Sequence, residues 1–247
     1  MSERRAFMGK GLPYVDTSGL SGCLIVIEGS DGVGRTTQIR LLRGWLEYQG
    51  YGVVDTDWTS SPLVSSTIDL AKEGHTMNVW TFNLLYATDF ADRLEHEIIP
   101  ALRAGFVVLS DRYVYTAIAR ACARGADRAW VQELFGFALE PDVVFYLEAD
   151  AETLVRRALL ADGLDYWESG LDQNPGLDPY DSFIRYQRKL LQEYARLARE
   201  FGFVTIDATS PIATVQRSLR RHLVPLLTRS SPPDPAPSVE PPGFAPA

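Results

Sequence analysis

The sequence predicts an α/β fold in which one parallel sheet lies between two layers of helices. Two observations predict it. Short, continuously apolar stretches rich in Val, Ile, Leu and Phe alternate with longer segments of helical pattern. A glycine-rich turn joins the first of these stretches to the first helical segment. The sequence shows no internal repeat, and residues 23–228 have the length of one domain, so they are predicted to form one.

Five strands are predicted, at 23–28, 51–56, 106–110, 142–147 and 203–207. Their β-branched and aromatic residues run without polar alternation, as in strands that are buried on both faces of a sheet. Because a helical segment lies between successive strands, we expect right-handed crossovers and parallel pairing. Ligands of such folds bind at the carboxyl ends of the strands.

Five helical segments are predicted between and after the strands. They span 36–49, 78–104, 151–160, 179–201 and 211–227. Gly50 marks the end of the first helix, and a break near Pro100 is expected in the second, because proline lacks the N–H that a helix interior requires.

The two ends of the chain differ from this domain. Residues 1–22 are predicted to form an N-terminal extension, and residues 229–247 a disordered tail. The tail holds 7 of the 15 prolines and almost no large apolar side chains, so it cannot bury enough surface to offset the entropy of ordering.

Composition excludes several classes of protein. The net charge of −8 argues against broad nucleic-acid binding, which depends on basic surfaces. No apolar stretch is long enough to span a membrane, and the first residues do not resemble a secretory signal. Two cysteines are too few for a disulfide framework. We therefore expect no membrane and no nucleic-acid partner, and a cytoplasmic location.

A phosphate-binding loop is predicted between the first strand and the first helix. The spacing Gly29-x4-Gly34-x-Thr36 lets the backbone curl so that several N–H groups and the positive end of the helix face an anion. Thr36 is placed to ligate Mg²⁺ through its hydroxyl group. Arg35 stands where such loops usually have lysine, so the positive charge is kept on a larger, planar group. The predicted phosphate-binding residues are Gly29, Ser30, Asp31, Gly32, Val33, Gly34, Arg35, Thr36 and Thr37.

Four segments carry a resemblance to a known family: EGSDGVGRTTQ at 28–38, LLYATD at 84–89, FVVLSDRYV at 106–114 and IDAT at 206–209. Together they resemble the thymidylate kinase family of nucleoside monophosphate kinases. The resemblance implies a P-loop NTPase fold, a three-layer α/β/α sandwich with a five-stranded parallel sheet. It also implies transfer of the γ-phosphoryl group of ATP to dTMP with Mg²⁺, and a homodimer.

The resemblance also implies roles for single residues. Asp31 would contact the 3′-hydroxyl group of the acceptor, Asp111 would lie beside Mg²⁺, and Arg112 would bind the acceptor phosphate. Phe90 and Tyr113 are placed at the acceptor as well. The predicted catalytic residues are Arg35, Asp111 and Arg112, and the predicted metal ligands are Thr36 and Asp111. A carboxylate and an arginine after a buried strand suit these roles.

Several positions depart from the family pattern around the acceptor base. Phe90 stands where the family often has a base-reading arginine, and Ala121 where it has a glutamine. The segment 57–62 replaces an Arg-Glu-Pro. These departures leave two alternatives open: a related kinase with another nucleotide or a nucleoside as acceptor, and a nucleotide-binding pseudokinase with a regulatory role.

The segment expected to form a mobile lid, 161–182, has no basic residue, although the family often takes a transition-state arginine from it. We hypothesise that Arg35 supplies both the loop cation and part of this stabilisation. The other candidates are Arg156, Arg157, Arg185 and Arg188. The aromatic and acidic residues of the lid are compatible with a closing flap and equally with a solvated acidic loop.

Overall fold

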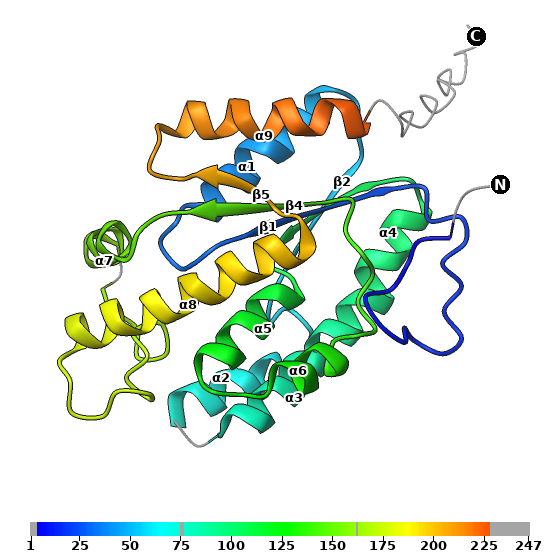
Figure 1. Ribbon diagram of the computed structural model, residues 1–247. Helices are drawn as coiled ribbons and strands as arrows, with labels where there is room; N and C mark the ends of the chain where they lie inside the picture. Colours follow the sequence, from blue (N-terminus) through cyan, green and yellow to red (C-terminus); the bar gives the residue numbers. More distant parts are fainter. Residues whose placement is uncertain (1–3, 75–76, 162, 228–247) are drawn as a thin grey trace, which may run out of the picture.

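The computed structural model describes residues 4–74, 77–161 and 163–227. Its centre is a sheet of five parallel strands in the order β2-β3-β1-β4-β5 (Figure 1). The strands are β1 (Cys23–Glu28), β2 (Val53–Asp57), β3 (Val107–Asp111), β4 (Val143–Glu148) and β5 (Val204–Asp207). The predicted α/β class and five-stranded parallel sheet are confirmed.

Helices cover both faces of the sheet. Figure 1 shows α1 (Arg35–Tyr48) and α9 (Ile212–Leu227) on one face, with α4 (Ile99–Arg103), α5 (Val114–Ala123) and α8 (Pro179–Phe201) on the other. Strand β1 contributes side chains to the core on both faces of the sheet, because successive side chains of a strand point to opposite faces. Leu24 and Val26 pack in the core beneath α5 and α8, while Ile25 and Ile27 pack in the core beneath α1 and α9.

The remaining helices connect this sandwich to the surface. They are α2 (Ser65–Gly74), α3 (Val79–Arg93), α6 (Arg128–Leu134) and α7 (Ala151–Leu160). The predicted helices at 36–49, 151–160, 179–201 and 211–227 are present with small shifts of their ends. Helices α2, α5 and α6 were not predicted from the sequence.

The long helical segment before β3 is not broken at Pro100. It passes from α3 through one π-helical turn, Leu94–Ile98, into α4. Pro100 has no N–H to donate and its ring crowds the carbonyl group four residues earlier, so the chain widens just before it. The irregularity that the sequence predicted is therefore a π-turn upstream of the proline.

All five strands end in an acidic residue at the same edge of the sheet. These residues are Glu28, Asp57, Asp111, Glu148 and Asp207. Strands β2 to β5 begin one or two residues later than predicted, and β2, β3 and β4 end one residue later. The carboxyl edge, where ligands of parallel sheets bind, is therefore lined with oxygen atoms.

The N-terminal segment packs on the domain from residue 4 onward. Met8 N donates a hydrogen bond of 2.8 Å to Ala138 O, and Glu140 N donates one of 2.9 Å to Ala6 O. The guanidinium group of Arg5 bonds Asp142 Oδ2 at 2.7 Å and Gly22 O at 2.9 Å. The predicted disordered tail, 229–247, lies outside the described residues. No helix in the described part of the chain is long and apolar enough to cross a membrane.

Candidate active site

The phosphate loop lies between β1 and α1, and its shape requires glycine at two positions. Gly29 has φ 146°, and a Cβ atom there would lie 2.7 Å from Leu147 O and 2.9 Å from a methyl group of Val33. Gly34 has φ 101° and precedes α1, whose first turn has no side-chain cap. The first amides of α1 are thus left for an anion, as the spacing predicted.

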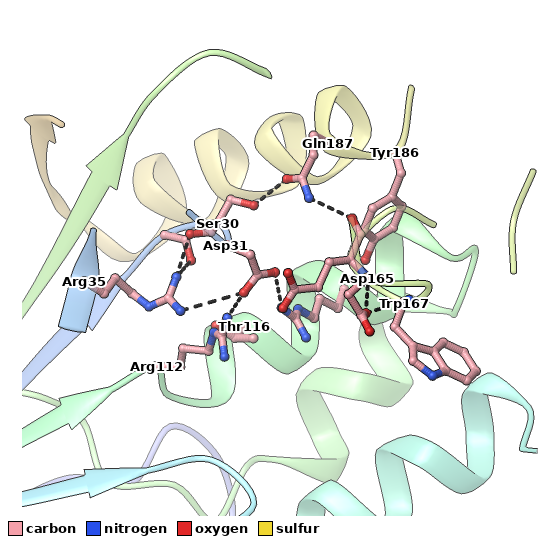
Figure 2. A network of polar contacts seen from close by, with 12 residues as sticks. Ser30, Asp31, Arg35, Arg112, Thr116, Asp165, Trp167, Tyr186 and Gln187 are labelled. Atoms are coloured by element: carbon pink, nitrogen blue, oxygen red, sulfur yellow. Dashed lines mark hydrogen bonds and ion pairs between the residues drawn. The ribbon is translucent and has the colours of Figure 1, made fainter. Parts of the chain in front are cut away.

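The side chain of Arg35 folds back under this loop (Figure 2). Its Nη1 donates to Ser30 O at 2.7 Å and also to Gly29 O, and its Nε donates to Asp111 Oδ1 at 2.6 Å. Only 8% of the residue is exposed. Arg35 is therefore bound to the loop backbone and to the end of β3 in this structure.

Oxygen atoms suited to Mg²⁺ meet at the ends of β2 and β3. Thr36 Oγ1 lies 3.5 Å from Asp111 Oδ2, and Asp57 pairs with Asp111 in the register of the two strands. Burial, and then the charge of Asp111, raise the pKa of Asp57. Two carboxylates and a hydroxyl group form a hard oxygen set. Among the described residues, no group of three or more His, Cys, Asp or Glu side chains could hold a metal ion.

Glu28, the last residue of β1, is fully buried and holds the start of α5. Its Oε1 accepts from Tyr113 N at 2.8 Å and Thr116 N at 3.3 Å, and its Oε2 accepts from Thr116 Oγ1 at 2.6 Å and Tyr194 Oη at 3.3 Å. Burial raises the pKa of Glu28 to about 7, although these hydrogen bonds act in the opposite direction. The carboxyl group fixes the first turn of α5 below the phosphate loop.

Three arginines surround the carboxylate of Asp31 in the loop. Arg112 bonds Oδ1, Arg120 bonds Oδ2 at 2.5 Å, and Nη2 of Arg35 lies 3.8 Å from Oδ1. Figure 2 shows Arg35 and Arg112 pointing toward Asp31. Burial, and then the nearby charge of Arg120, lower the pKa of Arg112 to about 10. Since Asp31 is a single negative charge among three cations, this cluster favours an additional anion.

Arg112 occupies an unusual backbone position directly after β3. Its φ is +68°, which only a few per cent of non-glycine residues adopt. Its N–H donates to Ile27 O at 3.0 Å, and its carbonyl oxygen accepts from Ser110 Oγ at 2.5 Å. These bonds hold the strained turn. The buried Nε of Arg112 has no hydrogen-bond partner among the described residues, which leaves a donor for a ligand.

A cavity of about 600 Å³ opens beside these arginines. Polar walls come from Arg112, Arg120 and Arg124 at the loop side. Apolar and amide walls come from α3 and from Trp58, directly after β2, and the lid closes the third side. The aromatic and amide lining residues of the cavity are Trp58, Asn78, Phe82, Asn83, Tyr86, Tyr166, Trp167 and Gln173. The cavity has the size of small-molecule sites and combines an anion-binding end with an aromatic end.

Phe90 and Tyr113, which the sequence placed at the acceptor, lie behind this cavity. Both are fully buried and neither lines it. Their rings meet edge to face at 4.9 Å, and the hydroxyl group of Tyr113 donates to Leu139 O at 2.9 Å. They support the wall from the core, where a ligand does not reach them in this conformation.

The lid, here residues 163–178, is docked across the cavity. Trp167 Nε1 donates to Lys72 O of α2 at 3.0 Å, and Arg124, directly after α5, donates to Trp167 O at 2.9 Å. Arg124 also pairs with Asp172 at 3.0 Å. Gln187 of α8 links the loop to the lid, since it accepts from Ser30 Oγ and donates to Glu168 O at 3.0 Å. Figure 2 shows Gln187 bonded to Ser30, and Asp165 bonded to Trp167 within the lid.

A second cavity, of about 240 Å³, lies on the other side of the loop. Gly32, Gly34 and Thr37 form one wall, and Ala208 and Ser210 form the opposite wall. Arg157 of α7 spans the gap, donating to Val33 O at 3.1 Å and to Ala208 O at 2.9 Å. The segment IDAT at 206–209 thus faces the loop, as expected for a nucleotide donor site.

The structure brings Arg35, Thr36, Asp111 and Arg112 together with Asp31, and leaves Phe90 and Tyr113 in the core. The sequence reading missed Glu28, Arg120 and Arg124 as site residues. Arg112, Thr116, Arg120 and Arg124 are four residues apart, a spacing that places side chains on one helix face. That signal was present in the sequence, but it required that 114–123 be recognised as a helix.

Comparison with known proteins gives one consistent result. The family model described as "Thymidylate kinase" matches residues 27–219. The chain is 38% identical over 206 residues to the probable thymidylate kinase 2 of Saccharolobus solfataricus, covering 83% of this chain and 96% of that protein. It is 33% identical over 209 residues to the probable thymidylate kinase of Thermococcus kodakarensis, covering 79% of this chain and 94% of that one.

Proposed function

Because the chain belongs to the thymidylate kinase family, we propose that it transfers the γ-phosphoryl group of ATP to dTMP, giving ADP and dTDP. The observation that supports this most directly is the placement of two cavities on opposite sides of one phosphate loop. The smaller adjoins the loop glycines and suits a nucleotide donor. The larger pairs an arginine cluster with an aromatic end and suits a nucleoside monophosphate.

The transfer is a direct displacement. An oxygen of the acceptor phosphate forms a bond to the γ-phosphorus while the bond from that phosphorus to the β,γ-bridging oxygen breaks, and ADP leaves. The loop from Gly29 to Thr37 holds the donor phosphates with its amides, and Arg35 provides its cation. Arg112 binds the acceptor phosphate, and Asp31 contacts the acceptor sugar. Catalysis consists of alignment and charge stabilisation.

Thr36 and Asp111 would hold Mg²⁺, with Asp57 beside them at the end of β2. The oxygen atoms present fit this ion, as their chemistry and spacing indicate. When bound, Mg²⁺ supplies positive charge to the donor phosphates. Asp111 also accepts from Arg35, so the same carboxylate orients the loop cation.

A kinase for another monophosphate is the second candidate, and the position of Phe90 favours it. Its ring is buried beside Trp58, and no charged side chain replaces the base-reading arginine at that position. Asn83, Asn78 and Gln173 are the amides on the cavity wall. An amide can donate and accept, so these residues suit a base with both kinds of group on its edge.

The experiment that tests the proposal measures ADP formation from ATP and Mg²⁺ with a panel of nucleoside monophosphates and nucleosides. Turnover with dTMP in preference to dCMP, dGMP and dAMP is the expected result. Preference for another monophosphate would favour the second candidate. ATP binding without turnover of any acceptor, measured by calorimetry, would favour a nucleotide-binding regulator.

We also propose that the protein forms a homodimer in the cytoplasm. Leu70 of α2 and Trp80 and Leu84 of α3 expose 69%, 45% and 52% of their surface, and helices α2 and α3 contact one another. Exposed apolar side chains on two helices in contact suit packing against a second copy of the chain. A Leu84→Glu variant that becomes monomeric by light scattering would support this packing. Cys23 and Cys122 are both free thiols, as in a reducing compartment.

A further inference from the structure

Arg120 of α5 is the second arginine that the acceptor cavity presents to Asp31. Its Nη2 bonds Asp31 Oδ2 at 2.5 Å, while Arg112 bonds Oδ1 of the same carboxylate. Both arginines line the 600 Å³ cavity, and 26% of the Arg120 side chain is exposed there. Within the described ranges of the chain, Asp31 is the one hydrogen-bond partner of Arg120. Most of its five N–H donors are therefore available to a ligand.

The other arginines considered as the transition-state cation lie outside the acceptor cavity. Arg156 donates to Glu152 O at 3.1 Å, and Arg188 pairs with the Glu152 carboxylate at 2.6 Å, both on the outside of α7. Arg157 bridges the walls of the donor cavity. None of these three lines the acceptor cavity, and the exposed Arg185 does not either. The described lid residues have no basic side chain. Of the other cations on the cavity wall, Arg124 is paired with Asp172 and Lys72 lies on α2. Arg120 is therefore the cation that lies next to Arg112 on the carboxylate of Asp31.

The charges around Arg112 and Arg120 are not balanced without a ligand. The guanidinium groups of Arg112 and Arg120 share the one carboxylate of Asp31. The buried guanidinium group of Arg35 also approaches Asp31, but it is already paired with Asp111. Glu168 of the lid is an acid on the cavity wall whose charge acts on both arginines. A phosphate that enters between the two arginines would receive two pairs of N–H donors, the geometry in which arginine binds phosphate most strongly.

We propose that Arg120 is a second phosphate-binding residue of the acceptor site, which clamps the acceptor phosphate together with Arg112. Asp31 holds the two guanidinium groups in place before the nucleotide arrives. During transfer the attacking oxygen of the acceptor phosphate bonds to the γ-phosphorus while the β,γ-bridging bond breaks and charge moves to the leaving ADP. Arg120 stays on the acceptor phosphate and holds its attacking oxygen in line. It thus adds a positive charge on the acceptor side, where the described lid residues have none. This inference rests on the proposed kinase function and names a binding residue for it.

The position of Glu28 explains how the clamp keeps its shape. Its carboxyl group binds the amides of Tyr113 and Thr116, the first turn of the helix that carries Arg120. Arg112 precedes that turn and Arg120 lies two turns further along the same helix. The two arginines are thus fixed relative to one another by one rigid element, as an enzyme site requires.

The test compares a ligand that has the phosphate with one that lacks it. Binding of dTMP and of thymidine to the full chain is measured by calorimetry without ATP, for wild type, Arg120→Ala and Arg120→Lys. We expect Arg120→Ala to weaken dTMP binding about 30-fold, in line with loss of a charged hydrogen bond, and to leave thymidine binding within about twofold. Arg120→Lys keeps the charge without the planar fork, so its loss is expected to be about 5-fold.

Arg128→Ala is the matched control. Arg128, on the neighbouring helix α6, pairs with Glu193 and Glu200 and lines neither cavity. It should bind both ligands as wild type does. Turnover adds a second readout: Arg120→Ala should lower kcat about 100-fold, because a misaligned attacking oxygen slows the transfer, while the KM for ATP stays within about twofold.

The outcomes separate the clamp from the proposed function. If wild type phosphorylates dTMP but Arg120→Ala and Arg120→Lys lose dTMP and thymidine binding equally, the clamp is wrong and the kinase function stands. If wild type prefers another monophosphate, binding of that monophosphate and of its nucleoside is compared in the same variants. A loss confined to the monophosphate supports the clamp, and an equal loss of both overturns it. If only nucleosides are phosphorylated, both ideas are overturned, since such an acceptor has no phosphate to clamp.

Discussion

Arg35 Nε donates a hydrogen bond of 2.6 Å to Asp111 Oδ1, so the cation of the phosphate loop is tied to the carboxyl end of β3. The same guanidinium group bonds the carbonyl oxygens of Gly29 and Ser30. One side chain therefore connects the loop to the strand that carries the proposed metal ligand. Lysine, with a single nitrogen, cannot make these bonds in the same directions.

Two substitutions of Arg35 are expected to show how much of its effect on turnover comes from its positive charge and how much from its planar guanidinium group. Arg35→Ala leaves Asp111 without its cation, and we expect kcat/KM for ATP to fall at least about 100-fold. Arg35→Lys keeps the charge and should stay within about tenfold of wild type. Steady-state kinetics over ATP concentration measures both. Arg43→Ala, which removes an exposed arginine of the same helix, is the control. Unchanged turnover in Arg35→Ala would exclude Arg35 as the loop cation.

Gly29 cannot accept a side chain without moving the loop. The added Cβ of Gly29→Ala would meet Leu147 O at 2.7 Å, and φ 146° is strained for alanine. We expect the free energy of unfolding to fall by about 1–3 kcal/mol. The affinity for ATP should fall more than about tenfold. Urea unfolding and calorimetry test this. Gly44→Ala in α1 has open space and should stabilise the protein by about 0.5–1 kcal/mol. Equal stability of both variants would contradict the prediction.

Glu28 is expected to make stability depend on pH. Its pKa is about 7 in the folded protein, above the ordinary glutamate value of 4.5, so the folded state holds its proton more tightly. Stability from this group is then fully present below about pH 4.5 and is lost as the pH rises toward 7. Glu28→Gln carries no such charge. Its carbonyl oxygen can accept the Tyr113 and Thr116 amides, and its amide group can donate to the Thr116 and Tyr194 hydroxyl groups.

The measurement is urea unfolding of wild type and Glu28→Gln at several pH values from about 5 to about 8. Wild type should lose stability relative to the variant as pH rises, by up to about 3 kcal/mol, because one pKa unit corresponds to about 1.4 kcal/mol. Histidines titrate in the same range but are common to both proteins, so they cancel in the difference. A difference that stays constant over this range would show that Glu28 does not titrate there.

Glu168 of the lid is expected to weaken binding of the acceptor phosphate. It lines the cavity with Arg112 and Arg120, and its charge acts on both. Glu168→Gln removes a negative charge near the phosphate, so dTMP should bind about 3–10-fold more tightly and thymidine equally. The gain should shrink in high salt. Glu152→Gln, on the outside of α7, removes the same charge away from the cavity and should change neither affinity.

Much of the fold followed from local sequence, and the errors have physical causes. The strands were found because their apolar runs are continuous, as burial on both faces requires. Helix α5 was missed because Val114 through Ala119 are all buried, so its two polar positions, Thr116 and Arg120, stand out little in a short and largely apolar helix. Helix α2 is short, and its exposed Leu70 obscures the pattern.

The site residues that directly follow a strand were predicted from the sequence. Those on a helix that the sequence did not reveal were missed. Asp111 and Arg112 lie directly after the apolar run of β3, so the sequence alone placed them at the sheet edge. Arg120 lies on α5, whose path only the structure reveals. The inward position of Phe90 could not be read from the sequence either, since an aromatic residue serves equally well in a core or in a pocket wall.

The pairing of residues 6–11 with residues 136–140 makes the N-terminal segment part of the cooperative structure. Met8, Gly11 and Glu140 donate backbone hydrogen bonds across this seam, and Phe7, Met8 and Leu12 pack on the core beneath α5. Their amides should therefore exchange with deuterium as slowly as those of the neighbouring core, not as those of a free terminus. A chain shortened to begin at β1 would expose to water the apolar core surface that these residues cover, and it would aggregate more readily on heating.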